Sequence, residues 1–121
     1  ELVSRVRQLT GAVAAVVVGY RSRKVMSQWG VSSMPVAAIA REMLRAYQAQ
    51  MALQRVTSDE AGNALPEMLV IHEPNVVVGV PLTLDEPGFV GAVFERAALT
   101  GAGLEADDAL RSMRRLVAPS T

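Results

Sequence analysis

The sequence contains no cysteine, a single histidine and few aromatic residues, with one Trp, two Tyr and two Phe among 121 residues. The absence of cysteine excludes disulfides, thiolate metal sites and cysteine nucleophiles, and it is typical of a reducing compartment. Long apolar runs are also missing, because the longest, Ala12 to Gly19, is much shorter than the roughly 20 residues that span a bilayer. We therefore expect a cytoplasmic protein with no signal peptide, no membrane insertion and no metal site.

The acidic and basic residues balance each other. Twelve Lys or Arg residues stand against twelve Asp or Glu residues. This balance argues against nucleic acid as a partner, because binding to a phosphate backbone requires a basic surface. Hydrophobic residues make up 50% of the chain, which is enough for one core at this length. We expect a single domain over residues 1–117, followed by a tail at 118–121.

Hydrophobic periodicity predicts both helices and strands. Leu2, Val6 and Leu9 recur at helical spacing, and β-branched runs broken by polar turns predict strands. The expected elements are a helix over 1–10, strands over 12–20 and 24–29, a long helix that starts near residue 35, strands over 68–72, 76–80 and 89–94, and a helix over 104–117. This order, α-β-β-α-β-β-β-α, predicts an α/β fold of the α+β kind, with one mostly antiparallel five-stranded sheet and helices on its faces.

The long helix is expected to have three distinct surfaces. Its broad apolar face should lie on the sheet, and it comprises Val36, Ile39, Ala40, Met43, Leu44, Tyr47 and Met51. On the opposite side lies a polar stripe of Arg41, Arg45, Gln48 and Arg55. Arginine is favoured at interfaces for its planar donors and packing stem, so the stripe is either a partner-binding surface or an ordinary solvated face. Between the two lies a flank that permits close helix approach and contains Ala46, Ala49 and Leu53.

The apparent chemical motifs have simpler explanations. Gly101-x-Gly103-x-x-Ala106 follows a predicted strand and opens a helix as a dinucleotide fingerprint does, but no strand follows that helix. The lone His72 cannot build a metal site unless carboxylates converge on it. Ser32 and Ser33 have no general base within predictable reach, and we expect them to cap the long helix. We therefore expect no catalytic residue and no cofactor.

Four segments carry a family resemblance. They are the opening LVSRVRQLTGAVAAVVV, the helix PVAAIAREMLRAYQAQM, the hairpin MLVIHEPNVVVGV and the ending FVGAVFERAALTGAGLEADDALRSMRRLV. Together they resemble the Roadblock family of dynein light-chain type domains, which in bacteria occur beside small GTPases, and the likeness spans residues 1–117. Two features depart from the family's pattern: a basic turn at 21–24 stands in place of a small Gly-containing turn, and Pro81 and Pro87 lie near the last strand.

The resemblance implies a homodimer in which the third strands of two chains pair edge to edge and the long helices pack side by side. Dimerisation would also cover the third strand, since a soluble protein must cover or pair such an edge. The family regulates or scaffolds small Ras-like GTPases, and no catalytic residue can be carried over from it. We expect a GTPase-binding surface at Arg41, Arg45, Gln48 and Arg55, and a dimer interface at Ala46, Ala49, Leu53, Met68, Val70 and His72.

Two alternatives stay open. A small-molecule-sensing domain of the PAS, GAF or profilin-like layout would hold its ligand between the sheet and the long helix. A nucleotide-dependent enzyme would use the glycine motif at 101–106.

Overall fold

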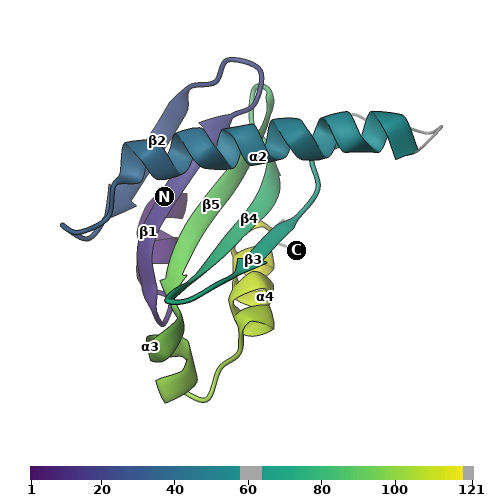
Figure 1. Ribbon diagram of the computed structural model, residues 1–121. Helices are drawn as coiled ribbons and strands as arrows, with labels where there is room; N and C mark the ends of the chain where they lie inside the picture. Colours follow the sequence, from purple (N-terminus) through teal and green to yellow (C-terminus); the bar gives the residue numbers. More distant parts are fainter. Residues whose placement is uncertain (58–63, 119–121) are drawn as a thin grey trace.

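The computed structural model describes residues 1–57 and 64–118. Its elements are α1 (Leu2–Arg7), β1 (Ala12–Gly19), β2 (Val25–Gly30), α2 (Val36–Thr57), β3 (Met68–Ile71), β4 (Asn75–Thr83), β5 (Pro87–Glu95), α3 (Arg96–Gly101) and α4 (Ala106–Val117). The expected order of helices and strands is confirmed, with the short helix α3 added between β5 and α4 (Figure 1). Residues 58–63 and the tail residues 119–121 lie outside the described residues.

The five strands form one antiparallel sheet in the order β2-β1-β5-β4-β3. Two hairpin-linked groups, β1–β2 and β3–β4–β5, join where β1 pairs with β5. Pro81 fits inside β4, opposite Phe89. The nitrogen of Pro81 faces the β3 side of the strand. Because β3 begins at Met68, which pairs with Gly79, no residue of β3 lies opposite Pro81, and no ladder hydrogen bond is lost there. Among the described residues, the sheet therefore has two free edges, β2 and β3.

Helices cover both faces of the sheet. Helix α2 packs on one face through the apolar residues expected from the sequence: Ala40, Met43, Tyr47 and Met51 are buried, and Val36, Ile39 and Leu44 are half-buried. The opposite face packs against α1, α3 and α4, through residues such as Val6, Leu99 and Met113. Within the described residues, no helix has the length and apolar character needed to span a membrane.

The start of α2 differs from the prediction. The helix begins at Val36, and the carbonyl of Pro35 accepts a hydrogen bond from the Ile39 amide at 3.0 Å. Ser32 and Ser33 are exposed in the preceding turn, where the Met34 amide donates to the Val31 carbonyl at 2.9 Å. Because the proline places the start of the helix after it, the serine hydroxyls are too early in the chain to cap the first amides. The predicted serine caps are therefore wrong.

Candidate partner-binding surfaces

Strand β3 presents an unpaired backbone edge. His72 donates its amide to the Asn75 carbonyl at 3.1 Å, and Val70 pairs with Val77 in the same register. Backbone groups alternate in direction along an antiparallel strand, so those of Leu69 and Ile71 point away from β4. The side chains of Val70 and Ile71 are 45% and 50% exposed. The structure thus places an apolar strand at the edge of the sheet, as the family resemblance implies.

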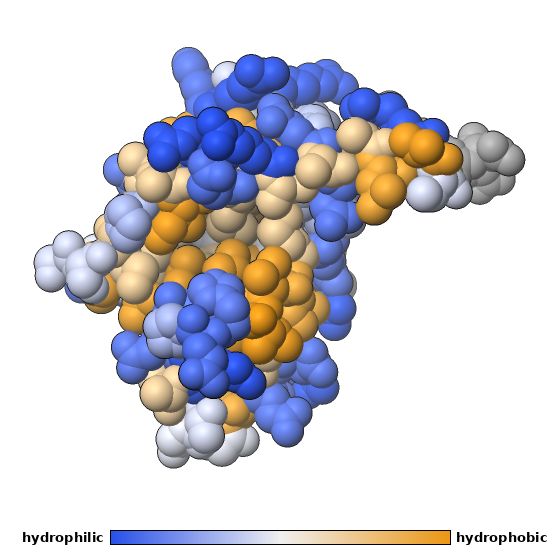
Figure 2. Space-filling view, in the orientation of Figure 1, coloured by the Kyte–Doolittle hydropathy of each residue, from blue (hydrophilic) through white to orange (hydrophobic). Residues whose placement is uncertain are grey.

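An apolar groove runs between β3 and α2. It has a volume of about 220 Å³, with Glu42 as its one charged residue, and is otherwise lined by Ile39, Met43, Ala46, Met68, Val70, Val77 and Val93. In Figure 2 hydrophobic surface extends below α2 on this side of the molecule. A segment that added to the β3 edge would lie beside this groove and could bury it.

The C-terminal turns of α2 project past the β3 side of the sheet (Figure 1). This part of the helix carries Leu53, which is 56% exposed, and Val56, which is 83% exposed. Ala49 and Ala52 are exposed on the same turns. These overhanging turns therefore present exposed apolar side chains and small alanine side chains beyond the edge of the sheet (Figure 2).

The residues predicted for the dimer interface are spread unevenly over this region. Val70, Ala49 and Leu53 are exposed, and Ala46 is half-buried at the groove. Met68 is only 8% exposed and belongs to the core under α2, because its side chain points to the face that α2 covers. His72 lies in the turn after β3. Sequence reasoning did not single out Val56 and Ile71, although both extend apolar patterns that it had identified.

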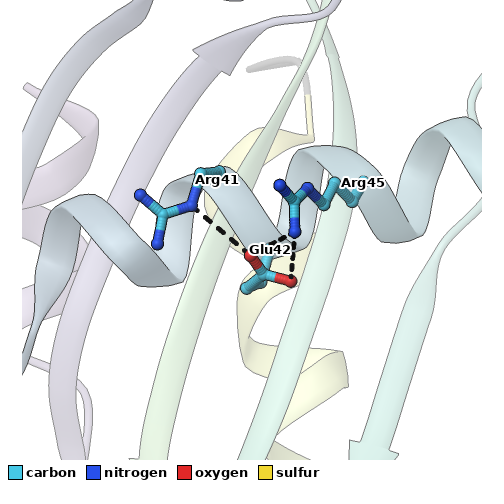
Figure 3. A network of polar contacts seen from close by, with 3 residues as sticks. All are labelled: Arg41, Glu42 and Arg45. Carbon is cyan, nitrogen blue, oxygen red and sulfur yellow. Dashed lines mark hydrogen bonds and ion pairs between the residues drawn. The ribbon is translucent and has the colours of Figure 1, made fainter.

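The polar stripe on α2 contains a carboxylate that the sequence reading left out. Glu42 pairs with both neighbouring arginines, at 3.4 Å to Arg41 Nε and 3.1 Å to Arg45 Nη1 (Figure 3). Arg55 is exposed and Gln48 is half-buried. Residues one or three positions apart on a helix point in different directions around its axis, but long side chains can reach across this separation. The stripe is therefore a mixed surface in which one carboxylate orients two guanidinium groups.

An ion pair fixes the approach to β3. Arg114 on α4 donates from Nη2 to Glu67 Oε1 at 2.6 Å and from Nε to Oε2 at 2.7 Å. Glu67 directly precedes β3, so the pair ties the start of the edge strand to α4. These hydrogen bonds from Arg114 hold the pKa of the Glu67 carboxyl below its ordinary value.

This pair predicts a pH-dependent loss of stability. A lowered folded-state pKa stabilises the fold above the unfolded pKa of about 4.3, and the contribution disappears as the pH falls through the folded value. Glu67→Gln should therefore lower the melting temperature at neutral pH, and its difference from the parent should shrink as the pH falls below about 4. Thermal unfolding followed by circular dichroism tests this. Glu73→Gln, at an exposed turn, is the control, and a pH-independent difference for Glu67→Gln would contradict the prediction.

The glycine motif does not form a phosphate site. It begins at Gly101, the last residue of helix α3, and does not follow a strand, so the expected strand-to-helix context is wrong. Gly103 has φ +75° in the linker to α4, which favours glycine for backbone reasons. At the start of α4, Glu105 and Asp108 form a capping box, with the Asp108 carboxylate accepting the Glu105 amide at 2.8 Å. These carboxylates occupy the position that a phosphate would need.

The small-molecule alternative requires a cavity between the sheet and α2. Met43, Tyr47 and Met51 from α2 pack there against Phe89, and the Tyr47 and Phe89 rings stack with centroids 4.3 Å apart. These side chains fill the space between the sheet and α2, and the open groove beside β3 lies at its margin. In the described residues, no group of His, Cys, Asp and Glu could hold a metal ion.

Comparisons with known proteins identify the architecture. No protein-family model matches the sequence, and no curated protein is significantly similar to it. The Roadblock/LC7 domain from Streptomyces avermitilis matches with a TM-score of 0.69 and 16% identity, over 96% of this chain and 88% of that one. The gliding protein MglB from Thermus thermophilus matches at 0.63 and 18%, over 96% and 85%. MglC from Myxococcus xanthus matches at 0.53 and 14%, over 93% and 90%. The chain therefore has the bacterial Roadblock-type fold.

Proposed function

We propose that this protein is a non-enzymatic regulator or scaffold of a small Ras-like GTPase and that it acts as a homodimer. The observation that carries the proposal is the combination of the Roadblock-type fold with an unpaired apolar edge at β3, beside an apolar groove and an overhanging helix. Roadblock proteins occur beside small GTPases in bacteria, so the family resemblance supplies the class of partner.

The uncovered β3 side supports the proposed homodimer. A second β3 strand would satisfy the outward backbone groups of Leu69 and Ile71. The overhanging turns of each α2 would then lie over the partner's sheet, where Leu53 and Val56 could be buried. Such a two-fold arrangement uses the same patch on both chains, as closed dimers do. A structure of MglB that is 18% identical to this chain, with a TM-score of 0.62, has a tetrameric arrangement, which also supports self-association.

We assign GTPase contact to the exposed side of α2. Arg41 and Arg45 are 62% and 67% exposed at their side chains, and Glu42 orients both guanidinium groups. Gln48 and Arg55 continue the surface toward the end of the helix. None of these arginines contributes to the buried core, so the surface is free for a partner. Planar donors held in position suit the recognition of carboxylates and carbonyls on a folded protein.

Capture of a GTPase tests the proposed function. The protein would be immobilised and exposed to small Ras-like GTPases from its source organism, each loaded with GDP or with a non-hydrolysable GTP analogue. We expect nucleotide-dependent capture of at least one of them. The GTP hydrolysis rate of the captured GTPase, measured with and without the protein, then separates an activator from a scaffold. If no GTPase were captured in either nucleotide state, the result would contradict the proposal.

The double variant Arg41→Ala/Arg45→Ala should separate binding from folding. Exposed substitutions usually change stability by no more than about 0.5 kcal/mol, whereas truncating central interface arginines costs about 2 kcal/mol of binding, or roughly 30-fold in affinity. We expect a nearly unchanged melting temperature and loss of GTPase capture. Arg115→Ala, at an exposed site on α4, is the matched control. Intact capture with a weakened fold would show that the stripe is structural.

A further inference from the structure

The exposed large apolar residues form two groups at opposite edges of the sheet. Four lie on the β3 side and were described above. The other three lie on or just after β2, where Val25 is 43% exposed, Met26 is 53% exposed and Val31 is 39% exposed. Since β2 and β3 are the two ends of the strand order, a homodimer through β3 leaves the β2 group uncovered.

Part of the β2 backbone is also free. The Gly19 amide donates to the Lys24 carbonyl at 2.9 Å, and the Val31 amide donates to the Val13 carbonyl at 3.0 Å. In this register Ser27 and Trp29 face β1, whereas the backbone groups of Gln28 point away from it. On the face that α2 covers, Val36 and Met34 leave no room for a side chain at Gly30. The register shifts between the Val25 and Ser27 pairs, so Met26 is a bulge residue with no partner in β1, and the free edge of β2 is therefore short and irregular.

A basic turn stands at the start of this edge. Arg21, Arg23 and Lys24 are exposed, and none of them makes an ion pair within the described residues. Glu86 Oε1, from the β4–β5 turn, accepts the amides of Arg21 at 2.7 Å and Ser22 at 2.8 Å. Among the described residues of these two turns, Asp85 and Glu86 carry the only carboxylates. The Glu86 carboxylate already accepts hydrogen bonds from backbone amides.

We infer that the free edge of β2 and its basic turn form a docking site for an extended acidic segment of a protein partner. The outward backbone groups of Gln28 can pair with a peptide strand, and Met26 and Val25 supply apolar contact. The three cations of the turn select acidic residues at one end of that strand. Three charges are too few for nucleic acid recognition, and a strand edge favours a peptide. The site goes beyond the proposed function, because it needs neither the dimer nor the GTPase.

The strand pairs of this sheet are all antiparallel, so we take the added segment to be antiparallel to β2 as well. Strand β2 runs away from the basic turn, so an antiparallel segment would end at the turn. Its acidic residues should therefore stand at its C-terminal end. The probe is a fluorescein-labelled peptide of alternating valine and threonine that ends in three glutamates, and the comparison peptide ends in three lysines. Fluorescence polarisation measures both.

We expect the acidic peptide to bind about tenfold more tightly than the lysine peptide, as a few exposed charge pairs allow, and its binding to weaken with salt. Arg21→Glu/Lys24→Glu should remove this preference. Gln28→Pro should abolish binding with the fold retained, because the lost N–H faces away from β1. If Gln28→Pro fails to fold, Met26→Glu takes its place and should repel the acidic peptide. The variant Val70→Asp, at the opposite edge, should bind the peptide like the parent.

Three outcomes would overturn the inference. If the two peptides bound equally tightly, the basic turn would not select acidic residues. If the folded variants Gln28→Pro and Met26→Glu bound the acidic peptide like the parent, the edge of β2 would not be the docking site. Binding to phosphatidylserine and phosphatidylcholine vesicles without binding to the acidic peptide would identify the turn as a membrane contact. Because peptide binding is measured without any GTPase, its failure is distinguishable from failure of the proposed function.

Discussion

Replacing Gly79 by alanine is expected to destabilise the fold by about 2–3 kcal/mol, as overpacking of a well-packed core does. A Cβ at this position would lie 2.5 Å from the Tyr47 hydroxyl oxygen and 3.1 Å from two ring carbons. Tyr47 cannot move aside easily, because its ring is fully buried and stacked on Phe89. Denaturant unfolding followed by circular dichroism measures the loss. Gly101→Ala is the control, since nothing lies within 4 Å of the added Cβ and stability should not fall.

Tyr47→Phe tests the cause of this effect. The Tyr47 hydroxyl is buried and finds no hydrogen-bond partner in the described part of the chain. Removing it should therefore leave stability unchanged or slightly raised, because an unsatisfied buried hydroxyl costs free energy. It also removes the atom closest to the new Cβ, so Gly79→Ala should cost less in the Tyr47→Phe background, with a coupling of about 1 kcal/mol. Additive costs would show that the clash is not with the hydroxyl.

Val70→Asp should raise the dimer dissociation constant by at least about 100-fold, or about 2.7 kcal/mol. Val70 lies on the α2 side of β3, so a dimer through this edge would bury two such carboxylates near its two-fold axis. Each would lose water without gaining a cation, and the two would repel each other. The monomer itself should remain folded, because Val70 is 45% exposed. Sedimentation over a range of concentrations measures the change.

The matched control is Met26→Asp, which makes the same kind of change at the opposite edge. Met26 is 53% exposed, and this variant should dimerise like the parent. A parent protein that is monomeric at tens of micromolar would contradict the homodimer. A Val70→Asp variant that still dimerises would place the interface away from β3, and the overhanging turns with Leu53 and Val56 would then be the first place to test.

Local patterns in the sequence were sufficient for the element types and for the main packing face. The spacing of Met43, Tyr47 and Met51 at helical periodicity predicted which side of α2 is buried, and the β-branched runs predicted the strands. These signals depend on periods of 3.6 and 2 residues, which are properties of the nearest neighbours in the chain. The helix α3 was missed because its six residues continue directly from β5 and show no separate apolar period.

The surfaces for partners depended on contacts between distant residues. Glu67 and Arg114 are 47 residues apart, and Glu86 reaches the amide of Arg21 across 65 residues. Even the pairing of Glu42 with both arginines required side-chain positions that a helical wheel does not give. The sequence by itself determined which segments are helices and strands and which faces are apolar, because these follow from local periodicity. Only the tertiary structure decided which strands become edges and which polar groups meet, because both depend on the order in which the strands pair.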